Sequence, residues 1–154
     1  MISEGDKLPD AMLTDPDGKE RTVSSLNGKP FVLFFYPKAS TPGCTTESVE
    51  FSEKKGAFEK LGVAVIGASA DSPKRQSNFI AKNDLTVDIL SDESTEWLEK
   101  LGVWAEKKNY GKTYMGIVRT TFLVDGDGKV AKVWSPVRVK GHVDAVLEAA
   151  KALG

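Results

Sequence analysis

Two apolar runs separated by one amphipathic segment constrain the fold of this chain most strongly. Residues 31–36 read Phe-Val-Leu-Phe-Phe-Tyr and residues 63–68 read Val-Ala-Val-Ile-Gly-Ala, and each run suits a strand buried on both faces. Between them we predict a helix over residues 44–61, with one face formed by Cys44, Ser48, Phe51, Lys55 and Phe58. Two buried strands joined through a helix form a right-handed parallel β-α-β unit, so the sequence predicts an α/β fold.

The flanking segments are shorter, and turn residues separate most of them. Phe51, Phe58 and Leu61 are expected to hold the central helix against the sheet. The other predicted elements are an N-terminal hairpin of residues 11–14 and 20–23, a helix over 73–82 capped by Asp71 or Ser72, a strand at 87–90, a short helix over 94–101, a mostly irregular segment 102–118, a hairpin of Thr120–Val124 and Val130–Trp134, and a final helix with Val143, Val146, Leu147, Ala150 and Leu153 on its apolar side.

Composition and charge limit the class of protein. The 154 residues are expected to form one domain (1–154) with a formal net charge of −1, which gives no reason to expect a nucleic-acid partner. The basic and aromatic cluster of Lys107, Lys108, Tyr110, Lys112 and Tyr114 is interpreted as a solvated loop. The first residues lack a signal-peptide pattern, and no apolar run approaches the ~20 residues that span a bilayer. We therefore expect a cytoplasmic protein without a membrane partner. We also expect it to be a monomer.

The only cysteine, Cys44, follows the first apolar run within Thr41-Pro42-Gly43-Cys44. Thr41 suits the N-cap of the predicted helix and Pro42 its first position, where a missing N–H costs nothing. The free amides of Gly43 and Cys44 and the positive end of the helix dipole would then favour a thiolate. A single cysteine excludes an intrachain disulfide and a C-x-x-C pair.

Pro37, Thr41 and Cys44 also form the pattern P-x-x-x-T-x-x-C, which resembles the peroxiredoxins, specifically the bacterioferritin-comigratory or Q-type branch. The resemblance covers nearly the whole chain and implies a thioredoxin-like three-layer fold with an N-terminal β-hairpin extension. The other segments that carry it are Gly5-Asp6-Lys7-Leu8-Pro9, Phe34-Phe35-Tyr36-Pro37-Lys38, Gly67-Ala68-Ser69, Leu90-Ser91-Asp92, Tyr114-Met115-Gly116-Ile117, Arg119-Thr120-Thr121-Phe122-Leu123 and Lys140-Gly141-His142.

Arg119 stands at the start of a predicted strand that runs antiparallel to residues 31–36 in such a fold. That strand would therefore start at the edge of the sheet where residues 31–36 end, which places Arg119 within reach of Cys44. The alternative is that Arg119 is an exposed surface residue. Glu47, one turn beyond Cys44, either orients Arg119 through a charge-assisted bond or is simply a solvated helix residue. His142 is expected to have a structural role at the start of the final helix.

The resemblance implies a thiol-dependent peroxidase that uses neither a metal nor a cofactor. Cys44 thiolate would attack hydrogen peroxide or an organic hydroperoxide and become a sulfenic acid. By the same resemblance, the Thr41 hydroxyl, the amides of Gly43 and Cys44, and Arg119 would donate to the peroxide oxygens. Pro42 would shield the thiolate from water, and Pro37, Gly43 and Glu47 would surround the substrate.

Many members of this branch have a second, resolving cysteine, at a position held here by Val49 or in the next helix, where this chain has Asn78, Phe79, Ile80 and Ala81. The chain therefore resembles a one-cysteine variant that needs an external thiol: thioredoxin, glutathione with a glutaredoxin, or another small thiol. A disulfide carrier would need a second cysteine. A peroxide-responsive redox sensor or chaperone could use the same thiol and is the alternative.

Overall fold

A computed structural model describes residues 2–39, 41–109 and 111–153. A seven-stranded sheet of order β2-β1-β5-β4-β3-β8-β9 forms its centre, and β6 and β7 form a separate two-stranded sheet. The elements are β1 (Met12–Thr14), β2 (Glu20–Thr22), the 3₁₀ helix η1 (Val23–Leu26), β3 (Phe31–Phe35), α1 (Pro42–Lys60), β4 (Ala64–Ser69), α2 (Pro73–Asn83), β5 (Asp88–Ser91), α3 (Glu96–Leu101), β6 (Trp104–Asn109), β7 (Lys112–Ile117), β8 (Thr120–Val124), β9 (Val130–Trp134) and α4 (His142–Leu153).

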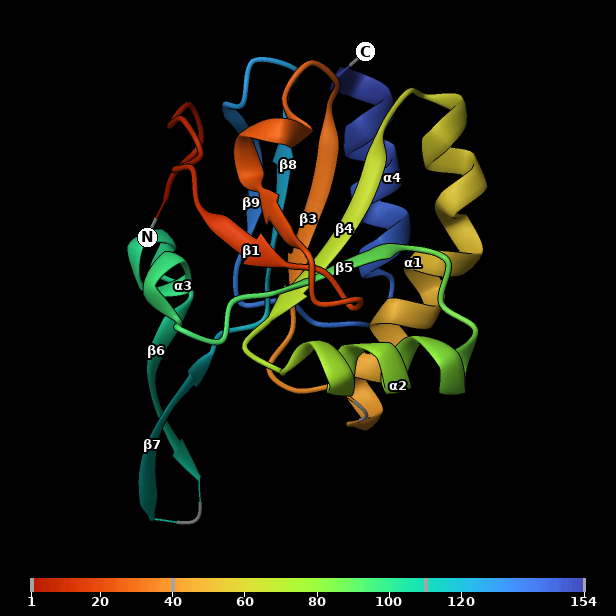
Figure 1. Cartoon of the computed structure of the whole chain (residues 1–154). Helices are drawn as coiled ribbons and strands as arrows, with labels where there is room; N and C mark the ends of the chain where they lie inside the picture. Colours follow the sequence, from red (N-terminus) through yellow and green to blue (C-terminus); the bar gives the residue numbers. More distant parts are fainter. Residues whose placement is uncertain (1, 40, 110, 154) are drawn as a thin grey trace.

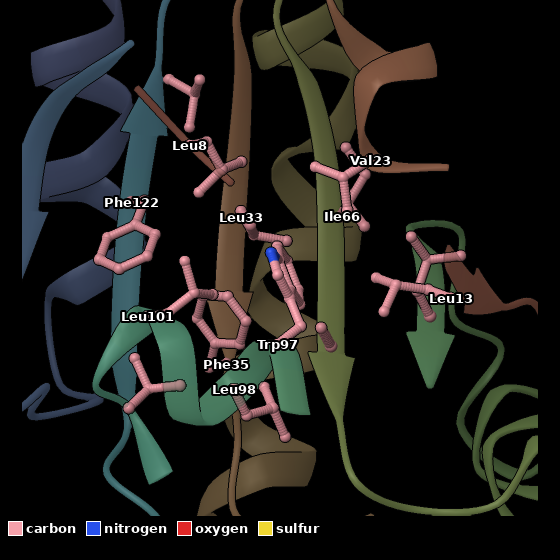
Figure 2. Packing of buried hydrophobic residues seen from close by; sticks show 14 of the residues in the cluster. Leu8, Leu13, Val23, Leu33, Phe35, Ile66, Trp97, Leu98, Leu101 and Phe122 are labelled. Carbon is pink, nitrogen blue, oxygen red and sulfur yellow. The ribbon is translucent and has the colours of Figure 1, made fainter. Parts of the chain in front are cut away.

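Helices cover both faces of the central sheet, as expected for a three-layer α/β fold (Figure 1). Every residue of β3 is buried, because its side chains point alternately into two separate cores. Phe31, Leu33 and Phe35 join the core on the side of α3 (Figure 2), whereas Val32 and Phe34 join the core under α1, α2 and α4. This double burial explains the continuous apolar run in the sequence.

The structure confirms the central β-α-β unit, since β3 pairs with β4 in parallel and α1 connects them. The N-terminal hairpin is present as the antiparallel pair β1–β2, and β8 pairs with β9 as the second predicted hairpin. Of the two candidate caps for α2, Ser72 has the role, because its hydroxyl oxygen accepts a hydrogen bond from the amide of Arg75 at 3.3 Å.

The prediction of a mostly irregular segment over residues 102–118 is wrong. The antiparallel hairpin β6–β7 occupies this region and extends away from the body of the molecule (Figure 1). Most of β7 is exposed, so neither strand shows the apolar alternation of a half-buried strand. The basic and aromatic cluster therefore lies on a hairpin instead of a loop, except Tyr110, which lies outside the described residues.

The expectation that Leu61 packs on the sheet is also wrong. Leu61 is the C-cap of α1 and remains 39% exposed, whereas Phe51 and Phe58 are fully buried as predicted. Among the described residues, no helix is both long and apolar enough to cross a bilayer.

Candidate active site

Cys44 lies in the first turn of α1, just after the loop that leaves β3. Thr41 occupies the N-cap position with extended backbone angles and Pro42 begins the helix, as predicted. The capping bond itself is absent: the Thr41 hydroxyl donates to the carbonyl oxygen of Lys38 at 2.7 Å, and its oxygen accepts no bond from the first turn. The Thr41 side chain therefore does not occupy the first-turn amides, which lie beside the sulfur at the N-terminus of the helix.

Arg119 reaches the thiol from the neighbouring strand. Strands β3 and β8 pair antiparallel, with Phe35 opposite Thr120, so the residue before β8 lies at the edge where β3 ends. The Nη2 atom of Arg119 is 3.2 Å from Cys44 Sγ, and the cysteine is 1% exposed. The structure therefore confirms the predicted proximity of Arg119 and Cys44, and the alternative of a surface arginine does not hold.

Glu47 fixes the other arm of the guanidinium. Its Oε1 atom accepts a hydrogen bond from Arg119 Nη1 at 2.8 Å, and its side chain is fully buried while that of Arg119 is 17% exposed. Of the two readings of Glu47, the structure thus supports a carboxyl that orients Arg119. Burial raises the pKa of Glu47 to about 7, against the opposing effect of the adjacent Arg119. Burial alone would lower the pKa of Arg119, but Cys44 and Glu47 raise it overall.

Gly43 allows this arrangement by having no side chain. A Cβ atom added there would lie 3.2 Å from Arg119 Nη2, a distance at which the guanidinium would have to shift. Gly43 and Pro42 are both exposed, in contrast to the buried Cys44 that follows them. The contact shows why the position before the cysteine suits glycine for steric reasons as well as for its amide.

Asp71, expected only as a possible helix cap, holds the loop that precedes Cys44. Its Oδ2 atom accepts hydrogen bonds from the backbone amide of Ala39 at 2.8 Å and from the hydroxyl of Ser69 at 2.7 Å. Ser69 in turn accepts from Gln76, and Gln76 accepts from the hydroxyl of Tyr36 at the end of β3. This buried chain of polar groups ties the loop to the sheet and to α2.

We expect Asp71→Ala to slow oxidation of Cys44 by peroxide by about 10- to 100-fold, because a small displacement of a reacting group costs this much. The substitution leaves two buried donors without an acceptor, which also lowers thermal stability. Stopped-flow oxidation and thermal unfolding would measure both effects. Asp127→Ala, at an exposed turn position, is the matched control. A parent-like rate in Asp71→Ala would show that the loop is held by other contacts.

A cavity of about 560 Å³ opens beside the same loop. Pro37 contributes to its wall, and the β6–β7 hairpin contributes Trp104, Lys107, Tyr114 and Ile117. Burial and the nearby Arg119 lower the pKa of Lys107, while Cys44 opposes this shift. Lys107 is therefore part of the electrostatic surroundings of the site, which sequence reasoning missed because it placed this segment in a loop.

His142 begins α4 as predicted, but it lies much closer to the site than its sequence position suggested. Its Nε2 atom is 2.8 Å from Thr121 Oγ1 and 4.0 Å from the Oε2 atom of Glu47. Thr121 follows Arg119 by two residues on β8, so the histidine packs directly behind the Arg119–Glu47 pair.

Comparison with known proteins agrees with this geometry. The family model described as "AhpC/TSA family" matches residues 4–133. The chain belongs to this family. It is 42% identical over 150 residues to peroxiredoxin Bcp of Bacillus subtilis (strain 168), covering 97% of this chain and 96% of the relative. It is 40% identical over 146 residues to peroxiredoxin Bcp of Escherichia coli (strain K12), covering 95% and 94%.

Solved structures of peroxiredoxins share the fold of this one. The bacterioferritin comigratory protein of Xanthomonas campestris, described for its alkyl peroxide reduction activity, has a TM-score of 0.87 and 40% identity, with 92% of this chain and 90% of that chain covered. BcpB of Mycobacterium tuberculosis has a TM-score of 0.89 and 33% identity, with 100% and 99% covered. This chain is thus a one-cysteine peroxiredoxin of the bacterioferritin-comigratory or Q type, a thiol-dependent peroxidase with a thioredoxin-like fold.

Proposed function

We propose that this peroxiredoxin reduces hydrogen peroxide and organic hydroperoxides with Cys44 as the nucleophile. The contact between Cys44 Sγ and Arg119 Nη2, at 3.2 Å, is the observation that carries the assignment. The thiolate attacks one oxygen of R–O–O–H, an S–O bond forms and the O–O bond breaks. The sulfur becomes a sulfenic acid, and the other oxygen leaves as water or an alcohol after it takes up a proton.

Charge moves from the sulfur to the leaving oxygen in this step, so preorganised donors around the peroxide lower the barrier. Arg119 and the free amides of Gly43 and Cys44 are suited to this role. The Thr41 hydroxyl has its hydrogen engaged with Lys38 O, so toward a peroxide it can only accept, and we assign it to the hydroxyl of R–O–O–H. Pro42 at the start of the helix shields the thiolate from water.

The cavity beside Pro37 supports the inclusion of organic hydroperoxides. Its wall combines Trp104, Tyr114 and Ile117 with the loop that carries the site, so an alkyl group attached to the peroxide could be received there. The alkyl peroxide reduction activity of the Xanthomonas campestris relative points in the same direction.

An external thiol completes the proposed cycle, because Cys44 is the only cysteine of the chain. The thiol attacks the sulfenic acid, an S–S bond forms and water leaves; a second thiol then releases the reduced Cys44. Thioredoxin, glutathione with a glutaredoxin, and other small thiols are the candidate reductants. We place the reaction in the cytoplasm, where such thiols are kept reduced. We also propose that the protein acts as a monomer and that residues 1–154 form one domain.

Treatment with peroxide alone should leave a monomer that is heavier by one oxygen, about 16 Da, because no second thiol in the chain can capture the sulfenic acid. Excess peroxide should then give the sulfinic acid, whereas added small thiol should give a mixed disulfide that further thiol clears. Intact mass measurement and non-reducing electrophoresis distinguish these products.

A disulfide between two copies of Cys44 is the competing product. It would need the two Cα atoms within ~7 Å, although each thiol is buried, so part of each chain would have to unfold. Rapid and quantitative covalent dimer formation would therefore contradict the external-thiol cycle.

The alternative is a redox sensor or chaperone in which oxidised Cys44 changes the binding of a partner. Steady-state consumption of peroxide separates the two functions, because a sensor reacts once and a peroxidase turns over. Screening thioredoxin, glutathione with glutaredoxin, and small thiols in this assay also identifies the reductant. If none of them sustains turnover while Cys44 is still oxidised, the sensor function is favoured.

A further inference from the structure

Glu47 has a buried carboxyl oxygen without a hydrogen-bond partner in the described part of the chain. Oε1 is bound to Arg119 Nη1, but Oε2 has no such partner and the side chain is fully buried. A buried carboxylate oxygen that lacks a donor raises the cost of the ionised form. The groups that face Oε2 therefore decide whether Glu47 can hold Arg119 as a full ion pair.

His142 is the group closest to this oxygen among the contacts of Glu47 with α4. Its Nε2 atom is 4.0 Å from Oε2 and 2.8 Å from Thr121 Oγ1. The edge-on rings of Phe51 and Trp134, with centroids 6.0 and 5.7 Å from that of the imidazole, hold the ring in this orientation. Nε2 is thus in hydrogen-bond contact with Thr121 and lies near the free oxygen of Glu47 without bonding to it.

The other charged groups near Glu47 come from three elements. Arg119 approaches from the start of β8, Cys44 and Glu50 lie on α1, and Lys107 of β6 is close to Arg119. Burial, with a contribution from Arg119, lowers the pKa of His142 to about 4, so near neutral pH the ring is uncharged and carries one N–H. A Glu47 carboxylate with Oε2 4.0 Å away favours the tautomer that has this hydrogen on Nε2, whereas a protonated Glu47 does not.

We propose that His142 is a positioning residue for Arg119: its Nε2–H, oriented by Thr121, stabilises the Glu47 carboxylate, and the protonation of Glu47 sets how firmly Arg119 is held on Cys44. The proposal rests on the role of Arg119 in the proposed peroxidase reaction. At 4.0 Å the Nε2–H acts on Oε2 as a dipole and not through a hydrogen bond, and such a dipole stabilises the ionised carboxylate more than the neutral carboxyl. The Glu47-dependent part of the peroxide rate should therefore rise with pH as Glu47 loses its proton, around pH 7.

The chain has a single histidine, so ¹⁵N-labelled histidine in untagged protein gives one set of imidazole signals. We expect the ring to stay neutral from pH 5 to 9 while its Nε2 signal shifts with a midpoint near 7, which reports Glu47. The step should persist in Cys44→Ser and disappear in Glu47→Gln. A ring that becomes cationic near pH 6.5, or a step that survives Glu47→Gln, would overturn the proposal.

Oxidation rates measured between pH 5.5 and 9 test the consequence for the reaction. His142→Leu removes the polar group nearest Oε2 and should move the Glu47-dependent rise by about one unit to higher pH. The Glu47-dependent part of the rate at pH 7 then falls about fivefold and recovers by pH 9. The side-chain amide of His142→Gln still offers an N–H group and should restore the pH profile of the parent. Val146→Ala, a loss of buried packing in the same helix, should leave the profile in place.

An equal loss of rate at every pH in His142→Leu, not restored by His142→Gln, would show a purely structural role and contradict the proposal. If His142→Leu does not fold, the NMR titration of the parent and of Glu47→Gln decides alone. Failure of the proposed peroxidase function would give a different result. The pH-dependent step in the NMR titration would remain, but Arg119→Ala would react with peroxide as fast as the parent.

Discussion

Cys44→Ser should abolish peroxide reduction and leave the fold intact. The hydroxyl is nearly isosteric with the thiol and can occupy the same buried position beside Arg119, but it is not a nucleophile at neutral pH. Stopped-flow mixing with hydrogen peroxide measures the loss, and circular dichroism checks the fold.

A thiol placed elsewhere on the same helix provides the matched control. Leu61→Cys in the Cys44→Ser background puts a cysteine at the C-cap of α1, in a half-exposed position and away from Arg119. It should react with peroxide only as an ordinary thiol does, because the helix end carries the opposite partial charge and offers carbonyl groups instead of amides. Retention of more than roughly a tenth of the parent rate in Cys44→Ser would disprove the assignment of Cys44 as the nucleophile.

Arg119→Ala should slow the attack of Cys44 on peroxide by about 10²-fold or more, the scale observed when one preorganised donor is removed. Arg119→Lys keeps a positive charge but not the planar fork that contacts both Glu47 and Cys44, so it should recover only part of the rate. Arg21→Ala, at an exposed position of the edge strand β2, is the control for loss of an arginine. A parent-like rate in Arg119→Ala would mean that the guanidinium does not act on the peroxide.

Arg119→Ala should also change how the stability of the fold depends on pH. The pKa of Glu47 is raised from 4.5 to about 7, so the stability that its protonated form contributes is present below about pH 4.5 and is lost as pH rises through 7. Arg119 opposes this shift, and its removal should move the pKa of Glu47 further up. We therefore expect Arg119→Ala to lower the melting temperature more at pH 8 than at pH 6, because only at the lower pH can Glu47 become neutral.

Much of the central fold could be predicted from local pattern. The apolar run of β3, the polar break after it and the helical spacing of Phe51 and Phe58 are features of neighbouring residues, and they predicted the β-α-β unit correctly. The hairpin β6–β7 was missed because most of β7 is exposed and residues 104–108 of β6 are half-buried or exposed, so burial imposes no apolar alternation on its sequence. Leu61 was misplaced because apolar character alone does not show where a helix ends: Leu61 is the C-cap of α1 and stays exposed.

The proximity of Arg119 to Cys44 could be inferred because strand direction converts a position in the sequence into an edge of the sheet. The buried polar contacts around the site could not be settled in the same way: the sequence left Glu47 open between a partner of Arg119 and a solvated residue, and it indicated Asp71 only as a possible helix cap. Glu47 binds Arg119 across 72 positions, and Asp71 holds the amide of Ala39 across 32. Buried polar contacts of this kind leave no periodic signal, since a charged residue in a helix or after a strand looks the same whether it faces solvent or a partner.

The sequence by itself determined that the thiol stands at the first turn of a helix behind a buried strand, because helix starts and buried strands are encoded by residues only a few positions apart. Only the tertiary structure decided that Glu47 is buried, that Arg119 links it to Cys44 and that His142 faces its free oxygen. These contacts depend on how α1, β8 and α4 pack together. Packing brings distant polar groups into one low-dielectric space, where their protonation and orientation depend on one another.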